Sequence, residues 1–267
     1  MRFSFAAVVL AGTVGSVQAG TCPPAQLWTT VSSSPVPTNV QLRVVFPAPG
    51  VEVFELVDGG PSIAKSGSAT AAESDVLVRK EGGAVVPTTL RRTTKAKHAS
   101  FIVQPRSPLV PNTRYAVVVR TKQAEYIVSR FTTGDGPDAV PPTLDRVVKA
   151  EFVRWKPSSP PHWKDPVGSF VELTLGGTQD VAGYEVHELQ AGEVPSDDTL
   201  RVVVRDRGTT LRFGSTDACL GADFEFPPVP KRTKSQPLHL WIRAFDAAGN
   251  LSPLREVTVD LGKQRTR

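Results

Sequence analysis

The side chains that could carry chemistry in this 267-residue sequence are few, and their spacing favours no catalytic or metal site. The histidines are scattered, and none has a second histidine or cysteine at a zinc-site spacing: His98, His162, His187 and His239. His187 and Glu188 come nearest to a ligand pair, but neighbouring strand residues point to opposite faces. The sequence also lacks a Gly-x-Ser-x-Gly elbow and a glycine-rich phosphate loop. We therefore expect a chain that is not an enzyme and that binds no cofactor or metal.

Residues 1–19 have the features of a secretory signal peptide. Met1 and Arg2 form a short positive end, an apolar stretch follows, and Val17-Gln18-Ala19 offers small residues at the cleavage positions. Later runs fall short of the roughly 18 uncharged apolar residues that a membrane helix needs. We expect an exported protein with no transmembrane span, located in the periplasm, at the cell surface or outside the cell.

Cys22 and Cys219 are the only cysteines in the chain. Export exposes thiols to oxidising conditions, and an even cysteine count without a metal partner suggests a disulfide. Such a bond would tie the segment before the first domain to the second domain and limit bending between the two. Two free thiols, or a bond between two chains, remain alternatives.

Composition indicates an all-β protein. The chain has 24 prolines and 21 glycines, so few stretches without breakers are long enough for a helix. Lysine and arginine number 31 against 26 aspartate and glutamate, and the formal charge of +5 is modest. Because the acidic residues are interspersed throughout, this excess predicts no specific nucleic-acid site.

A hinge rich in proline and glycine divides the chain into two units. In RFTTGDGPDAVPP, residues 130–142, Gly134 and Gly136 let the backbone turn, and two prolines interrupt regular pairing. We predict a lead-in at 20–35, a β-sandwich at 36–135, a linker at 136–142, a second β-sandwich at 143–262 and a frayed basic tail at 263–267. An exposed hinge also predicts protease cleavage between residues 134 and 139.

Each unit contains seven short β-type runs, a number typical of a sandwich. The runs cover residues 40–46, 51–57, 75–80, 85–91, 100–104, 114–121 and 126–133, and then 144–155, 168–175, 183–190, 199–205, 210–213, 237–246 and 252–261. Alternation places Tyr115, Val117 and Val119 on one face of their run, and Leu240 and Ile242 on one face of theirs. We expect two consecutive sandwiches with these faces toward the cores.

A tyrosine corner is the most specific local signal in the first unit. In LVPNTRYAVVV, residues 109–119, Tyr115 begins a strand, so that its ring is buried while its hydroxyl reaches upstream backbone. With FTTGD at residues 131–135, this segment resembles the bacterial Ig-like domain of S-layer and other surface proteins, over about residues 36–135. The resemblance implies a role in spacing or adhesion rather than catalysis.

A turn near the C-terminus carries the corresponding signal in the second unit. IRAFDAAGNLSP, residues 242–253, resembles the last hairpin of bacterial fibronectin type III or Ig-like modules. Gly249 and Asn250 tolerate left-handed conformations, and Asp246 can accept backbone N–H bonds across the turn. We assign these three residues, with Tyr115, a structural role.

Two segments are candidate binding surfaces. Arg91, Arg92, Lys95 and Lys97, followed by His98, could contact an anionic surface, or they could form a solvated loop. The proline-rich stretch WKPSSPPHWKDP could display aromatic rings to a sugar, or could pack over a sheet edge; its candidate residues are Trp155, His162 and Trp163. Trp28 and Trp241 are expected in the core. The carboxylates near the hinge lack the pattern of a calcium loop: Asp135, Asp138 and Asp145.

These patterns favour a non-catalytic exported interaction or spacer protein of the cell envelope or surface. An accessory glycan-binding module of a surface enzyme or adhesion system is the alternative. The expected partner is an unknown protein or glycan at the envelope, and the chain is expected to be monomeric.

Overall fold

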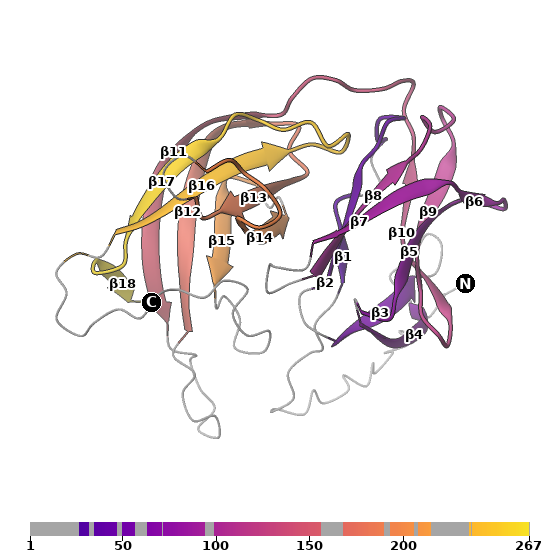
Figure 1. The fold of residues 1–267 in the computed structure, drawn as a ribbon, viewed down its shortest axis with the longest axis horizontal. Coiled ribbons are helices and arrows are strands. Elements are labelled where there is room, and N and C mark those ends of the chain that lie inside the picture. The colour runs from indigo at the N-terminus through magenta and orange to yellow at the C-terminus, as the bar shows by residue number, and fades with distance from the viewer. Residues whose placement is uncertain are drawn as a thin grey trace, which may run out of the picture.

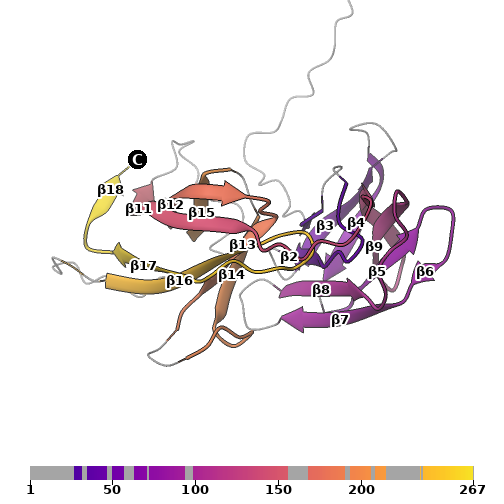
Figure 2. The same cartoon turned by 90° about the horizontal axis from the view of Figure 1, so that it is seen from above.

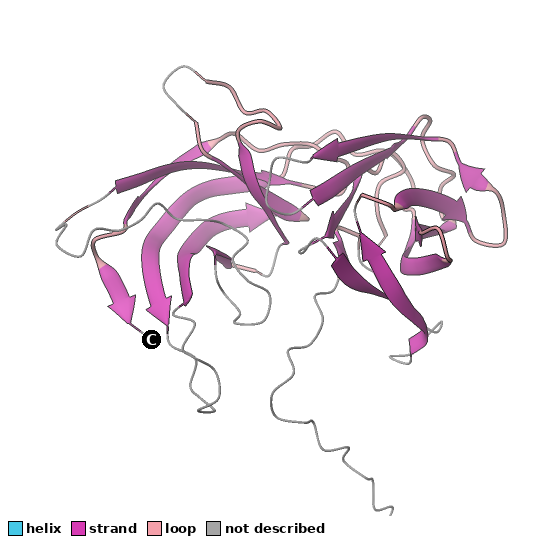
Figure 3. Ribbon diagram, turned by 60° about the horizontal axis from the view of Figure 1, so that its bottom comes forward, coloured by secondary structure: helices cyan, strands magenta, loops and turns pink. Residues whose placement is uncertain are grey.

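The computed structural model describes residues 27–31, 35–46, 50–56, 63–70, 72–93, 99–155, 168–189, 193–205, 208–214, 235 and 237–266. The regular structure in these ranges consists of β-strands, which Figure 3 shows gathered in two groups. Within the same ranges, no helix is long and apolar enough to cross a membrane.

The first unit is a sandwich of two four-stranded sheets with an added hairpin (Figure 1). The sheets have the strand orders β1-β2-β8-β7 and β10-β9-β5-β6, and β3 pairs with β4. The strands are β1 (Trp28–Thr29), β2 (Leu42–Phe46), β3 (Gly50–Leu56), β4 (Ile63–Thr70), β5 (Asp75–Lys80), β6 (Val85–Val86), β7 (Thr88–Thr93), β8 (Ala99–Pro105), β9 (Arg114–Arg120) and β10 (Glu125–Thr132).

The second unit is also a sandwich of two four-stranded sheets. Their strand orders are β15-β12-β11-β18 and β14-β13-β16-β17. The strands are β11 (Thr143–Trp155), β12 (Gly168–Gln179), β13 (Gly183–His187), β14 (Leu200–Arg205), β15 (Thr210–Gly214), β16 (Pro237–Phe245), β17 (Arg255–Asp260) and β18 (Gln264–Thr266).

Each sandwich has its own core, filled by the inward residues of its two sheets. Tyr115, Val117 and Val119 of β9 lie in the first core, and Leu240 and Ile242 of β16 lie in the second, as their alternation predicts. The structure confirms an all-β chain of two consecutive Ig-like β-sandwiches.

Some elements differ from the sequence prediction. The single run at 85–91 is two strands, because Pro87 cannot donate to a ladder and the chain changes sheets there. The prediction did not include β4, whose small residues pair with β3. The frayed basic tail is also wrong for Gln264–Thr266, which pairs in parallel with residues 152–154 at the edge of β11. Its backbone gains the hydrogen bonds that this edge offers.

The two sandwiches lie side by side, with a face of one sheet toward a face of another (Figures 1 and 2). A separate apolar cluster fills the space between them. It contains Val45 of β2, Leu200 and Val203 of β14, and Phe245 of β16, all buried, with the half-buried Trp28 packed against them. The docked faces are therefore held by apolar contacts as well as by polar ones.

The connection between the sandwiches is hydrogen-bonded along much of its length. The N–H of Gly134 donates to the carbonyl of Val36 at 2.7 Å. The Asn39 side chain donates to the carbonyl of Asp138 at 2.7 Å and accepts from its N–H at 2.9 Å. From the second sandwich, Asn250 donates to the same carbonyl at 3.3 Å. The backbone of Asp138 is thus bound to both sandwiches rather than free to turn.

Candidate functional site

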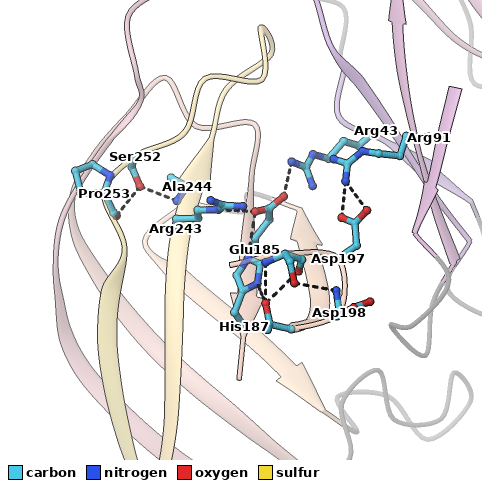
Figure 4. Close-up of polar contacts among 12 residues, drawn as sticks. Arg43, Arg91, Glu185, His187, Asp197, Asp198, Arg243, Ala244, Ser252 and Pro253 are labelled. Atoms are coloured by element: carbon cyan, nitrogen blue, oxygen red, sulfur yellow. Dashed lines mark hydrogen bonds and ion pairs between the residues drawn. The ribbon is translucent and has the colours of Figure 1, made fainter. Parts of the chain in front are cut away.

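A buried group of charged side chains lies where the two sandwiches meet. Arg43 in β2 and Glu185 in β13 alternate with core residues, so each points away from the core of its own sandwich. Docking brings these two outward positions together. Figure 4 shows Arg43, Glu185, His187 and Arg243 converging there, and we call these four residues with Thr199 the interdomain cluster.

Glu185 is the centre of the interdomain cluster. Its Oε1 lies 2.5 Å from Nη2 of Arg43, and its Oε2 lies 2.6 Å from Nε of Arg243. Nε2 of His187 lies 3.2 Å from the same Oε2. The side chains of Arg43 and Glu185 are 3% and 5% exposed, so their ion pair is shielded from solvent. Both carboxylate oxygens are already occupied by donors.

His187 joins the carboxylate to the loop before β14. Because a carboxylate only accepts, Nε2 carries the proton in its contact with Glu185. On the other side of the ring, Nδ1 lies 3.1 Å from the Thr199 hydroxyl, which donates to the carbonyl of Ser196 at 3.0 Å. The same hydroxyl oxygen accepts from the N–H of Ser196 at 2.9 Å. The imidazole therefore fixes the loop against the strand that carries Glu185.

The pKa values of the cluster follow from burial and charge. Burial raises the pKa of Glu185, but the His187 hydrogen bond and the charges of Arg43 and Arg243 together lower that pKa far below its usual range. Burial lowers the pKa of Arg43, and the charge of Glu185 opposes this shift. The ionised pair is thus maintained by its mutual contacts.

Arg43 has one polar partner and one aromatic partner. Its guanidinium carbon lies 4.0 Å from the centre of the Phe245 ring, a cation–π contact across the domain boundary. Its Nε and Nη1 atoms are buried, and no hydrogen-bond partner for them exists among the described residues. The cost of removing the Arg43 guanidinium from water is therefore offset mainly by its contacts with Glu185 and the Phe245 ring.

Two further contacts border the interdomain cluster. At one side, Arg91 of β7 pairs with Asp197 at 2.5 Å, with side chains 56% and 40% exposed. At the other, the turn after β16 lies against Gln41, whose N–H donates to the carbonyl of Ala247 at 2.8 Å. Gly249 in this turn has φ +85°, and a Cβ there would lie 2.6 Å from the Gln41 side chain.

The arrangement can hold two domains together, but it does not offer a reactive group. A general base needs a free oxygen that a substrate can reach, and both oxygens of Glu185 are paired with arginine side chains. The cluster therefore fixes the orientation of the two sandwiches. A buried charge is stable only in the docking geometry that keeps its counter-charge in place.

The structure places the predicted structural residues as follows. Tyr115 lies near the start of β9, its ring stacks with that of Phe131 at 5.7 Å, and its hydroxyl accepts from the N–H of Val110 at 3.1 Å. Asp246 accepts from both the backbone and the side-chain nitrogen of Asn250, each at 2.9 Å. The turn that these residues form with Gly249 closes a hairpin and also contacts the first sandwich.

Of the predicted binding residues, the structure describes the side chains of Arg91 and Arg92. Arg91 is paired with Asp197, and Arg92 lies over the ring of Phe101 at 5.6 Å. Several residues lie outside the described ranges, and predictions about them stay untested: Cys22, Lys95, Lys97, His162, Trp163 and Cys219, with the side chain of Trp155. Trp241 is half-buried on the face of β16 that points away from the core.

Carboxylates and histidines do not assemble into a metal centre in the part of the chain that the structure describes. Asp135 accepts from the side chain of Asn112 at 3.0 Å, and Asp138 accepts from the N–H of Val140 at 2.8 Å. Asp135 thus joins two loops of the first sandwich, and Asp138 stabilises a local turn.

Sequence reasoning missed the pair at the centre of the interface. A signal was nevertheless present: LRVVF places Arg43, and GYEVH places Glu185, inside strands that are otherwise mostly apolar. A charge at such a position needs a partner, because an isolated buried charge is very unfavourable. Which two charges pair across a domain boundary is a property of the docked structure.

No protein-family model matches this chain, and no curated protein matches it. Similar solved structures include the N-terminal Ig1-2 module of the Drosophila receptor protein tyrosine phosphatase DLAR, with 9% identity over 91% of this chain and 99% of that chain and a TM-score of 0.26. A chimeric titin Z1Z2-Z1Z2 tandem carrying a fibronectin GRGDS peptide has 12% identity over 92% and 100%, with a TM-score of 0.20. A chimeric titin Z1Z2 carrying a decorin KLER peptide has 10% identity over 91% and 94%, with a TM-score of 0.23. The description of this chain as two consecutive Ig-like β-sandwiches rests on its own facing sheets and two separate cores.

Proposed function

We propose that this chain is a non-catalytic exported interaction or spacer protein of the cell envelope or surface, in which the two sandwiches act as one rigid unit. The observation that carries the proposal is the buried contact between Arg43 and Glu185, surrounded by apolar side chains of both sandwiches. Domains in one chain move relative to each other unless their interface is large and apolar. An interface with its own apolar cluster and ion pair favours a fixed spacing.

A fixed spacing is useful to a protein that presents surfaces. The sheets that face away from the interface keep a constant separation and angle, so a partner that contacts both loses little conformational freedom on binding. The signal peptide predicted at residues 1–19 supports export, and the resemblance of the two halves to bacterial Ig-like and fibronectin type III modules supports a place at the cell surface.

Export and rigidity are tested by separate measurements. Mass spectrometry of the full chain expressed in a bacterial host should find an exported form that lacks residues 1–19. Small-angle X-ray scattering of this form should fit the docked pair as a single particle, and Glu185→Leu should increase its radius of gyration. The matched control is Glu188→Gln, which changes an exposed carboxylate 47% open to solvent.

Three results would count against the proposal: retention of the uncleaved chain in the cytoplasm, a flexible scattering profile for the wild type, or turnover of a substrate. Binding to an immobilised glycan that is lost on Trp163→Ala would instead support the glycan-binding alternative.

A further inference from the structure

Strand β7 forms an open edge of the first sandwich. It is the last strand of the sheet β1-β2-β8-β7, and Figure 2 shows it along the outer margin of the molecule. Its six residues pair with β8 without a register shift. A regular edge without a bulge or proline is a template for another extended chain.

The hydrogen-bond pattern shows which β7 groups face outward. The N–H of Arg106 donates to the carbonyl of Pro87 at 3.0 Å, so these two residues form a hydrogen-bonded pair of the antiparallel ladder. Such pairs alternate with non-bonded ones, which places Thr88, Leu90 and Arg92 in the non-bonded positions. Pro105, opposite Thr88, has no N–H to give, in agreement with this register. The N–H and C=O groups of these three residues therefore point away from β8, and no described residue bonds to them.

Apolar surface accompanies this free edge. Leu90 lies opposite the core residue Val103, yet Leu90 is 45% exposed. The opposite sheet ends in the two-residue strand β6, where Val85 is 41% exposed. Each of the two sheets thus ends on this side with an exposed apolar residue. An added strand would bury Leu90, and removal of apolar surface from water favours association.

The charge at the edge is positive. Arg92 lies over the ring of Phe101, and no carboxylate among the described residues pairs with it. Arg91 points to the other face of the sheet and is held by Asp197. The residues that follow β7 continue the basic character in the sequence, with Lys95 and Lys97. An acidic segment is the complementary partner.

Three other edge strands, β10, β14 and β17, have neighbours beyond their own sheets. Strand β10 is contacted by β3 and β1, and β17 is contacted by β11 of the facing sheet. Strand β14 carries Leu200 and Val203, which are buried against the first sandwich. Among the described residues, the edge of β7 thus combines backbone groups without partners, exposed apolar surface and a positive charge without a carboxylate partner.

We infer that β7 accepts an extended acidic segment of a partner protein as an additional strand. Backbone groups of Thr88, Leu90 and Arg92 supply the hydrogen bonds, as in other cases of strand addition. In the antiparallel orientation, the segment places an acidic residue opposite Arg92 and, two positions later, an apolar residue opposite Leu90. The inference rests on the proposed role as an interaction protein and names the chemistry of its partner.

The test is a selection of displayed random peptides on the exported full chain. Enriched peptides should contain the acidic-x-apolar pattern, and their binding should weaken at least tenfold with Leu90→Lys or Arg92→Glu, while Arg92→Lys retains most of it. The control is Val194→Lys, which changes a valine 75% exposed in the second sandwich. Unchanged thermal unfolding of each variant excludes a folding defect.

Amide hydrogen exchange locates the bound peptide. Binding should slow exchange at Thr88, Leu90 and Arg92, whereas Thr89 and Arg91 are already bonded to β8 and should change little. The inference is overturned by peptides that bind all variants equally, by selected peptides without acidic residues, or by self-association of the chain that Leu90→Lys abolishes. Because export and rigidity are measured separately, loss of this inference leaves the proposed function testable.

Discussion

Arg43 of the first sandwich and Glu185 of the second form an ion pair of 2.5 Å in which both side chains are almost fully buried. The two residues are far apart in the sequence and meet only because two sheet faces dock. Removing two charges from water is unfavourable, and their attraction offsets this penalty only when the geometry is good. The pair therefore opposes sliding of one sheet over the other, which apolar contacts alone would permit more readily.

Removal of the central carboxylate should strongly destabilise the chain. Glu185→Leu leaves Arg43 buried without a counter-charge, and such uncompensated charges lower the free energy of unfolding by about 3–5 kcal/mol. Urea denaturation measures the change. Glu188→Gln, which breaks the exposed pair with Arg201, should lower the free energy of unfolding by less than about 1 kcal/mol. Similar losses in the two variants would contradict the assigned role of Glu185.

Replacement of Arg43 should destabilise the chain less than replacement of Glu185. In Arg43→Met, Glu185 keeps Arg243 and His187 as partners, whereas Arg43 has no other polar partner among the described residues when Glu185 is lost. We expect a smaller loss for Arg43→Met than for Glu185→Leu, and partial recovery in the double variant, because apolar pairs often replace buried ion pairs at little cost. A double-mutant cycle by denaturation checks both expectations. Additive losses would show that the two side chains are not coupled.

The contribution of Glu185 to the free energy of unfolding should depend on pH. Its folded-state pKa lies below the ordinary glutamate value of 4.5, so its contribution is present above that pH and is lost as the pH falls toward the folded-state pKa. The difference in unfolding free energy between wild type and Glu185→Gln should therefore shrink by about 2 kcal/mol between pH 6 and pH 3, since each pH unit below the unfolded pKa removes about 1.4 kcal/mol.

The same comparison separates Glu185 from other carboxylates. Burial raises the pKa of Asp246, so its contribution has the opposite sign: it is present at low pH and is lost as the pH rises. Both proteins in the comparison contain Asp246, and its effect cancels. A difference that stays constant over this pH range would rule out a lowered pKa for Glu185.

The tyrosine corner gives a local prediction in the first sandwich. Tyr115→Phe keeps the ring that stacks on Phe131 but removes the acceptor of the Val110 N–H, so it should lower the unfolding free energy by about 1 kcal/mol. Tyr115→Ala also removes the buried ring and should lower it by about 3–5 kcal/mol. Chemical denaturation of both variants separates the hydroxyl from the ring. A loss as large for phenylalanine as for alanine would contradict this division.

The sequence predicted the fold well because the strands alternate clearly. The core faces of β9 and β16 follow the period of two, and breakers mark many strand ends, since these depend on neighbouring residues alone. The polar and apolar contacts between the sandwiches could not be predicted in this way. Arg43, Glu185 and Phe245 occupy outward positions that alternation alone assigns to solvent, and only the docked arrangement buries them.

The last prediction concerns protease resistance of the connection between the sandwiches. It differs from the cleavage that the sequence alone predicts. Glycines near residues 134–136 suggested a hinge open to proteases, but Asn39 bonds both the N–H and the carbonyl of Asp138. Proteases cleave backbone that opens locally, and backbone held by both sandwiches opens rarely. The wild type should therefore resist cleavage at residues 134–139, and Asn39→Ala should speed cleavage there several-fold. The matched control is Asp135→Ala, which removes the exposed bond from Asn112 but leaves Asp138 bound. Rapid cleavage of the wild type at this segment would show instead that the domains separate freely in solution.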